Sequence, residues 1–174
     1  MIRLFLFSTL TTLNFHSFAT EQIDDIFTIG FKGKTYPIAE RPLSQKFDNE
    51  TIRLILEPDF CTASWRGYKA RWQLLDGKLM LNSMQKNPCE RKFNPVSSGD
   101  FFGTQEYPIH ADWFTGKITL MVGEESYRHE NGVQIGYDQD VFVFNFQNGK
   151  LISKGMEALK YRYKKRLLEP KDEH

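Results

Sequence analysis

The sequence is poor in the features that mark several classes of protein. Its 174 residues include only two cysteines and no CxxC spacing, which excludes a cysteine-based zinc site. Neither sign of charge dominates, since 23 Lys and Arg balance 22 Asp and Glu. Nucleic-acid-binding proteins usually carry a basic excess. No apolar run reaches the roughly 18–20 residues of a membrane-spanning helix. We expect no metal, no cofactor, no nucleic-acid partner and no transmembrane span.

Aromatic residues are abundant instead. They make up 14% of the chain, with 15 Phe, 7 Tyr and 3 Trp, and hydrophobic residues make up 40%. A disordered chain would be poorer in aromatics, so this composition predicts a packed core. The length predicts a single domain.

The first nineteen residues have the pattern of a secretory signal peptide. Arg3 is followed by an apolar stretch that reaches Phe18 without an acidic residue. Ser17 and Ala19 place small residues at −3 and −1 of a cleavage site before Thr20. Polar residues interrupt the stretch, and an N-terminal strand or helix of a cytosolic domain is the alternative. We expect residues 1–19 to be removed near Ala19, leaving residues 20–174 as one periplasmic or secreted domain.

The clearest hairpin signal lies in the first half of the chain. Residues 69–75 (K-A-R-W-Q-L-L) and 78–82 (K-L-M-L-N) are strand-like and flank Asp76-Gly77. This pair suits a type I′ turn, in which both central residues have positive φ.

The two cysteines lie on either side of this hairpin. Cys61 comes 15 residues before Asp76, and Cys89 comes 12 residues after Gly77, so both fall near its open end. In an oxidising compartment they would form a disulfide, and two unrelated buried thiols are the alternative. Closing a loop of about 28 residues would stabilise the fold by roughly 3–4 kcal/mol.

The rest of the chain reads mostly as short strands separated by turns. A second hairpin turn is expected at Asn148-Gly149. Two polar stretches, 88–103 and 123–136, are expected to be loops. Together these patterns predict a mainly antiparallel β domain, either a sandwich or a partly open barrel. The other strand-like runs are 27–31, 34–38, 52–56, 110–114, 117–122, 141–146 and 150–153.

Residues 155–168 fit two patterns. Met156, Leu159 and Tyr163 recur at helical spacing, which favours a short C-terminal helix. Leu159, Tyr161 and Tyr163 also alternate as in a strand. The run is basic, and its cations either form a solvated face or contact an anionic partner surface. These cations are Lys160, Arg162, Lys164, Lys165 and Arg166.

Two segments resemble a family of bacterial hypothetical proteins. The first is W-R-G-Y-K-A-R-W at 65–72, followed by L-M-L at 79–81. The second is A-D-W-F-T-G-K-I at 111–118, followed by G-Y at 136–137 and a strand that ends in an N-G turn. Order and spacing agree over most of the central chain. The resemblance implies a shared fold and a shared surface, and it implies no catalytic residues.

The first segment has a clear strand phase. Arg66, Tyr68 and Trp72 would share one face, and Trp65 and Arg71 the other. This phase favours Trp72 and Trp113 as core anchors. The alternative is an aromatic-lined groove with Arg66 as its polar contact, because a guanidinium can stack on rings or clamp a carboxylate. The candidate binding residues are Trp65, Arg66, Tyr68, Trp113 and Tyr137.

Three functions remain open. The leading hypothesis is an exported, non-catalytic protein that binds a protein partner, such as an immunity or inhibitor protein. The second is a carrier of a small ligand in an aromatic-lined cavity. The third is a hydrolase that uses His110 and Asp112, which would lie on the same side of a strand.

Overall fold

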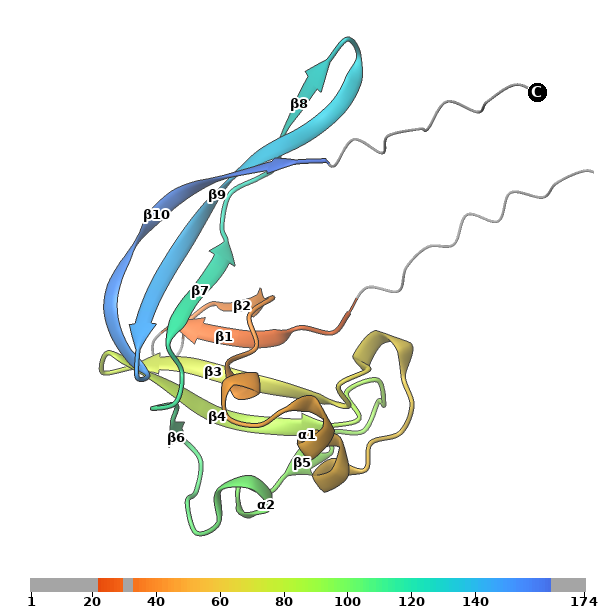
Figure 1. Ribbon diagram of the computed structural model, residues 1–174, viewed down its shortest axis with the longest axis vertical. Coiled ribbons are helices and arrows are strands. Elements are labelled where there is room, and N and C mark those ends of the chain that lie inside the picture. Colours follow the sequence, from red (N-terminus) through yellow and green to blue (C-terminus); the bar gives the residue numbers. More distant parts are fainter. Residues whose placement is uncertain (1–21, 30–32, 164–174) are drawn as a thin grey trace, which may run out of the picture.

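The computed structural model describes residues 22–29 and 33–163 (Figure 1). The expected signal peptide lies outside these residues. The described part is mainly β, as predicted. Its strands are β1 (Asp25–Ile29), β2 (Thr35–Ile38), β3 (Tyr68–Leu75), β4 (Lys78–Lys86), β5 (Pro95–Val96), β6 (Ile109–His110), β7 (Gly116–Met121), β8 (Ser126–Glu130), β9 (Val133–Gln147) and β10 (Lys150–Arg162). Its α-helices are α1 (Asn49–Leu56) and α2 (Gly99–Phe102), and two short 3₁₀ turns span Pro42–Gln45 and Thr62–Ser64.

The strands form one curved sheet in the order β2-β1-β3-β4-β10-β9-β7. Every described strand pair is antiparallel except β1–β3, which is parallel. The two ends of the sheet lie close together. A hydrogen bond joins them, in which the backbone N–H of Thr119 on β7 donates to Oε1 of Glu40, just after β2 (3.0 Å). The architecture is an open, strongly curved sheet, which fits the partly open barrel better than the sandwich.

Both predicted hairpin turns are confirmed. Asp76 and Gly77 have φ of 47° and 71°, and Asn148 and Gly149 have φ of 48° and 69°. Such positive values at both central positions give the turn a twist that matches that of the flanking strands.

The stretch 123–136 is not the loop that we predicted. β8 and β9 form a third hairpin within it, turning at Asn131 and Gly132 with φ of 51° and 76°. The Asn-Gly pair is the turn signal that our sequence analysis passed over.

The expected strand at 52–56 is also wrong, because these residues belong to α1. Asp48 caps this helix by accepting the backbone N–H of Thr51 (2.7 Å). Ile52 and Leu56, one helical turn apart, are buried. The side-chain cap at Asp48 therefore favours a helix, although the residues of this run are typical of strands. The expected strand at 110–114 is shorter than predicted, since β6 ends at His110.

The helix favoured over 155–168 is wrong as far as the structure describes it. β10 continues to Arg162 and pairs with β9 at each of residues 153–162. Residues 164–168 lie outside the description. Hydrogen bonding to β9 keeps these residues in a strand, and the residue types alone do not show this tertiary contact.

Aromatic and aliphatic side chains fill the inner face of the sheet. Phe27 on β1 packs against Phe144 on β9 with ring centroids 5.4 Å apart. The core is therefore built across strands that are distant in sequence. Its largest fully buried side chains include Phe27, Tyr68, Trp72, Leu79, Leu81, Ile118, Phe144 and Phe146.

β9 and β10 are much longer than the strands beside them. With β8 they extend away from β1–β4 as a three-stranded projection, at the upper part of Figure 1. We call residues 126–140 and 157–163 the arm, and the remaining described residues the body.

The expected disulfide joins Cys61 to Cys89. It lies beside the open end of the β3–β4 hairpin, where Tyr68 pairs with Lys86. The bridge therefore ties the segment after α1 to the segment after β4.

Replacing both cysteines with serine should lower the free energy of unfolding by roughly 3–4 kcal/mol, because the unfolded chain regains the freedom of the closed loop. Urea denaturation of the two proteins measures the difference. Adding reductant to the wild type should give the same loss. Equal midpoints for the oxidised and the serine protein would contradict a stabilising bridge.

Candidate functional site

The candidate binding residue Arg66 lies inside the body, beside a buried carboxylate. Asp25 on β1 is fully buried, and its Oδ1 lies 3.3 Å from Nη1 of Arg66, which is 5% exposed. Two further groups donate to this carboxylate: the backbone N–H of Ala70 and Nε1 of Trp72, both at 3.1 Å. Asp25 thus gathers three donors from the first motif of the resemblance.

The other contacts of Arg66 are also internal. Its Nη2 donates to the carbonyl of Ile23 (3.0 Å), and its guanidinium lies over the ring of Tyr68, 4.9 Å from the centroid. Tyr68 and Trp72 are fully buried. The predicted strand phase is confirmed from Tyr68 to Trp72, whereas Arg66 lies in the turn just before β3. Arg66 and Tyr68 together hold this segment against β1.

Burial raises the pKa of Asp25 above that of an ordinary aspartate, while Arg66 and the hydrogen bonds from Ala70 and Trp72 oppose the rise. The Arg66 charge therefore favours the ionised form of this carboxylate.

Replacing Arg66 with Met should destabilise the protein by about 3–5 kcal/mol at neutral pH, because a buried carboxylate loses its countercharge. The pKa of Asp25 in the folded variant rises further, so the folded state takes up a proton at a pH where the unfolded chain does not. The stability of the variant should therefore increase as the pH falls through that raised pKa. Urea denaturation from pH 7 to pH 4 measures this.

The matched control is the same substitution in an Asp25→Asn background. There the loss caused by Arg66→Met should no longer vary with pH, because residue 25 no longer titrates. A loss from Arg66→Met that is equal at every pH would contradict the charge pairing.

Two neighbouring motif residues have different positions. Trp65 is 40% exposed, and the guanidinium of Arg41 lies 5.4 Å from its ring. Gly67 has φ of 79°, and a Cβ there would lie 2.2 Å from the Pro58 ring. Glycine is thus required at 67 for a close approach, and Trp65 is the part of the motif that reaches the surface.

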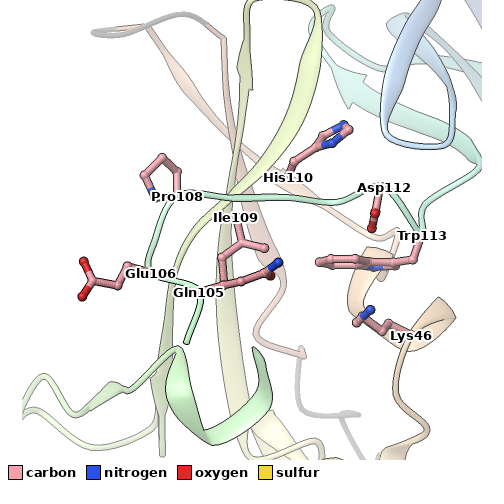
Figure 2. A pocket seen from close by; sticks show the side chains of 8 residues that line it. All are labelled: Lys46, Gln105, Glu106, Pro108, Ile109, His110, Asp112 and Trp113. Atoms are coloured by element: carbon pink, nitrogen blue, oxygen red, sulfur yellow. The ribbon is translucent and has the colours of Figure 1, made fainter. Parts of the chain in front are cut away.

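Trp113 lines a surface pocket of about 520 Å³ (Figure 2). Its Nε1 donates to the carbonyl of Pro42 (3.1 Å), and its ring stacks on Phe102 with centroids 5.5 Å apart. Nζ of Lys46 lies over the Trp113 ring, 4.9 Å from its centroid. Trp113 is half-buried, so it anchors the turn after β6 and leaves part of its ring to the pocket.

His110 and Asp112 both line this pocket, but no hydrogen bond joins them. Figure 2 shows the imidazole and the carboxylate directed to opposite sides of the chain. Nε2 of His110 is buried and has no hydrogen-bond partner among the described residues. It lies close to the β9–β10 turn, since a Cβ on Gly149 would lie 2.8 Å from it. In this structure the carboxylate does not orient the imidazole.

A cluster of exposed aromatic residues lies on the arm. Tyr127, Tyr137 and Tyr161 are register partners across β8, β9 and β10, so they share one face. Their ring centroids are 6.3 and 5.2 Å apart, and Tyr163 lies 5.6 Å from Tyr161. Tyr127, Tyr161 and Tyr163 are 52%, 45% and 44% exposed.

Polar groups hold this tyrosine row in place. The hydroxyl of Tyr127 donates to Glu125, and this carboxylate raises the pKa of Tyr127. Nε2 of Gln134 donates to the Tyr163 hydroxyl (2.9 Å). On the opposite face, Arg128 pairs with Asp138 (3.2 Å) and donates to the Tyr161 carbonyl (2.9 Å). The three strands of the arm are thus fastened to one another.

The same face continues from the tyrosines into a groove of about 360 Å³ beside the body. Leu159, Val141 and Met121 form part of its lining, on register positions that share the face of Tyr137. Asp24 and Glu40 line it from the side of β1 and β2. We call the four tyrosines and Leu159 of the arm, together with the adjoining Val141 and Met121 of the body, the arm face.

The structure distributes the predicted binding residues over three places. Arg66 and Tyr68 lie in the core, Trp65 and Trp113 lie at separate surface positions, and only Tyr137 belongs to the arm face. Its neighbours Tyr127, Tyr161 and Tyr163 were not predicted as binding residues. Recognising the Asn-Gly turn between β8 and β9 would have brought Tyr127 opposite Tyr137.

The basic run of β10 lies away from these rings. Lys160 and Arg162 occupy the alternate positions of β10, on the face opposite the tyrosines. The other three cations of that run lie outside the described residues.

No protein-family model, curated protein or solved structure matches the chain. Within residues 22–29 and 33–163, no helix has the length and apolar composition to cross a membrane. In the same residues, no group of three or more His, Cys, Asp or Glu side chains is arranged to hold a metal ion.

Proposed function

We propose that this chain is an exported, non-catalytic binding protein that holds a protein partner on the arm face. The observation that carries the proposal is the row of exposed tyrosines, continuous with a groove lined by both apolar and charged residues. Tyrosine offers a large and rigid contact area with a polar tip, which is why binding surfaces are rich in it. Contiguous exposed apolar surface of this kind marks interaction sites.

The location rests on two features. A bridge between Cys61 and Cys89 fits an oxidising compartment, and the first nineteen residues have the pattern of a signal peptide. An immunity or inhibitor protein that acts in the periplasm or outside the cell is one concrete form of this proposal, and the resemblance to the bacterial family is compatible with it.

The structure gives less support to the two alternatives. A carrier would need its aromatics to line a cavity, whereas Phe27, Tyr68 and Trp72 pack into the inner face of the sheet with no exposed surface. A hydrolase would need His110 to be oriented by Asp112, and their side chains diverge (Figure 2).

The compartment is tested by the intact mass of the protein isolated from its native host. We expect the mass of residues 20–174, about 2 Da lighter than after reduction, because a disulfide forms with loss of two hydrogens. A full-length mass with free thiols would contradict export.

The binding face is tested by capture from a cell-envelope extract with the wild type and a Tyr137→Ser/Tyr161→Ser variant. We expect the variant to lose the captured protein, with affinity reduced at least about tenfold, because central aromatic residues dominate binding energy. Melting temperatures check that the variant folds.

The matched control is Phe60→Ser/Phe93→Ser, which removes two exposed aromatics of the body, 85% and 55% exposed. This variant should capture the same protein as the wild type. Undiminished capture by the tyrosine variant would overturn the arm face as the binding surface.

A further inference from the structure

β10 has one long edge that no described strand covers. β9 pairs with β10 along its whole length, but on the other side only Lys150 pairs, with Lys78 of β4. Among the described residues, no strand lies along residues 153–163 on that side. The open edge begins at the body and runs to the end of the arm.

The backbone groups at this edge can be assigned from one hydrogen bond. The N–H of Tyr163 donates to the carbonyl of Ile135 on β9 (2.9 Å). In an antiparallel pair, successive residues direct their N–H and C=O alternately toward and away from the partner strand. The odd-numbered residues of β10 therefore face β9. The even-numbered residues between 154 and 162 direct their donors and acceptors to the open edge.

Such an edge is a template for another strand. We propose that two copies of this chain pair in antiparallel fashion along β10, with residues 155–163 of each strand facing one another and Leu159 on the two-fold axis. The pairing makes one six-stranded sheet from two arms and places both tyrosine rows on the same face. This inference rests on the edge of β10 and does not require the proposed partner.

The charges of β10 select this register. If the two-fold axis lay at Glu157, that carboxylate would face its own copy, and Lys154 would face Lys160. If the axis lay at residue 158, Lys154 would face Arg162. Like charges directly opposite each other destabilise strand pairs. With the axis at Leu159, every charged residue between 155 and 163 faces an uncharged side chain, and Lys154 is opposite Lys164, which lies outside the described residues.

Two further features favour the same register. Tyr163 of each copy lies opposite Gly155 of the other, so an aromatic ring covers a residue that has no side chain to pack. An axis at Leu159 also sits far along the arm from Lys150, where β10 meets the body. The two bodies then lie at opposite ends of the paired strands, and about eight backbone hydrogen bonds form between the copies.

Disulfide trapping tests the register. In the wild-type background, Leu159→Cys should form a covalent dimer under mild oxidation. Residue 159 directs its backbone groups toward β9, so its two copies form a non-hydrogen-bonded pair with Cα atoms about 4.5 Å apart. Glu157→Cys, on the same face, is the matched control and should stay monomeric, because it lies opposite Tyr161. Equal trapping of both variants, or of neither, would overturn the register.

A proline tests the pairing without an added thiol. The N–H of Ala158 faces the open edge, so Ala158→Pro removes a donor that the fold itself does not use. By light scattering after size exclusion, the wild type should have twice the mass of one chain. The proline variant should have the mass of one chain and keep the far-UV circular dichroism spectrum of the wild type, and Ala158→Val should remain a dimer. A wild type that is monomeric at every concentration up to about 100 μM would overturn the proposal.

Discussion

The fold of the body depends on the ion pair and the hydrogen bonds that one buried carboxylate accepts. Asp25 has no exposed surface, and its donors come from Arg66, Ala70 and Trp72, more than forty residues further along the chain. A slip of one residue between β1 and β3 would turn Asp25 outward and leave these donors without a partner. The network therefore fixes the parallel β1–β3 pair. Because β2 pairs with β1, the network also holds β2 in place. β2 lies near the opposite end of the sheet, and the sheet curves around its core between them.

The arm and the body are stabilised in different ways. In the body, aromatic side chains of the inner face meet one another across the curved sheet. β9 and β10 extend past this core, so their side chains have no opposing layer, and Tyr161 and Tyr127 remain 45% and 52% exposed. Such a projection gains its rigidity from cross-strand contacts, here the tyrosine row on one face and Arg128 on the other. A body held together by its interior and an arm that offers its side chains outward suit a binding protein better than an enzyme with an enclosed site.

Local sequence signals predicted those parts of the fold that local chemistry decides. The turns at Asp76-Gly77 and Asn148-Gly149, the alternation around Trp72 and the cysteine pair all follow from short-range patterns. The strand expected at 52–56 failed because the cap at Asp48 was overlooked. Asp25 was not singled out at all, because its importance comes from groups distant in sequence. The tyrosine row was missed for a similar reason, since its members come from three strands that the sequence analysis did not bring together.

The central claim is that the arm, and not the body, is the contact surface of this protein. Amide hydrogen exchange, measured on the full chain at low and high protein concentration, tests it most directly. The account predicts that exchange slows with concentration only at the outward-facing amides of β10, including those of Ala158 and Lys160, while the amides of β3 and β4 are unchanged. Slowing that is confined to the body, or that spares β10, would contradict the account.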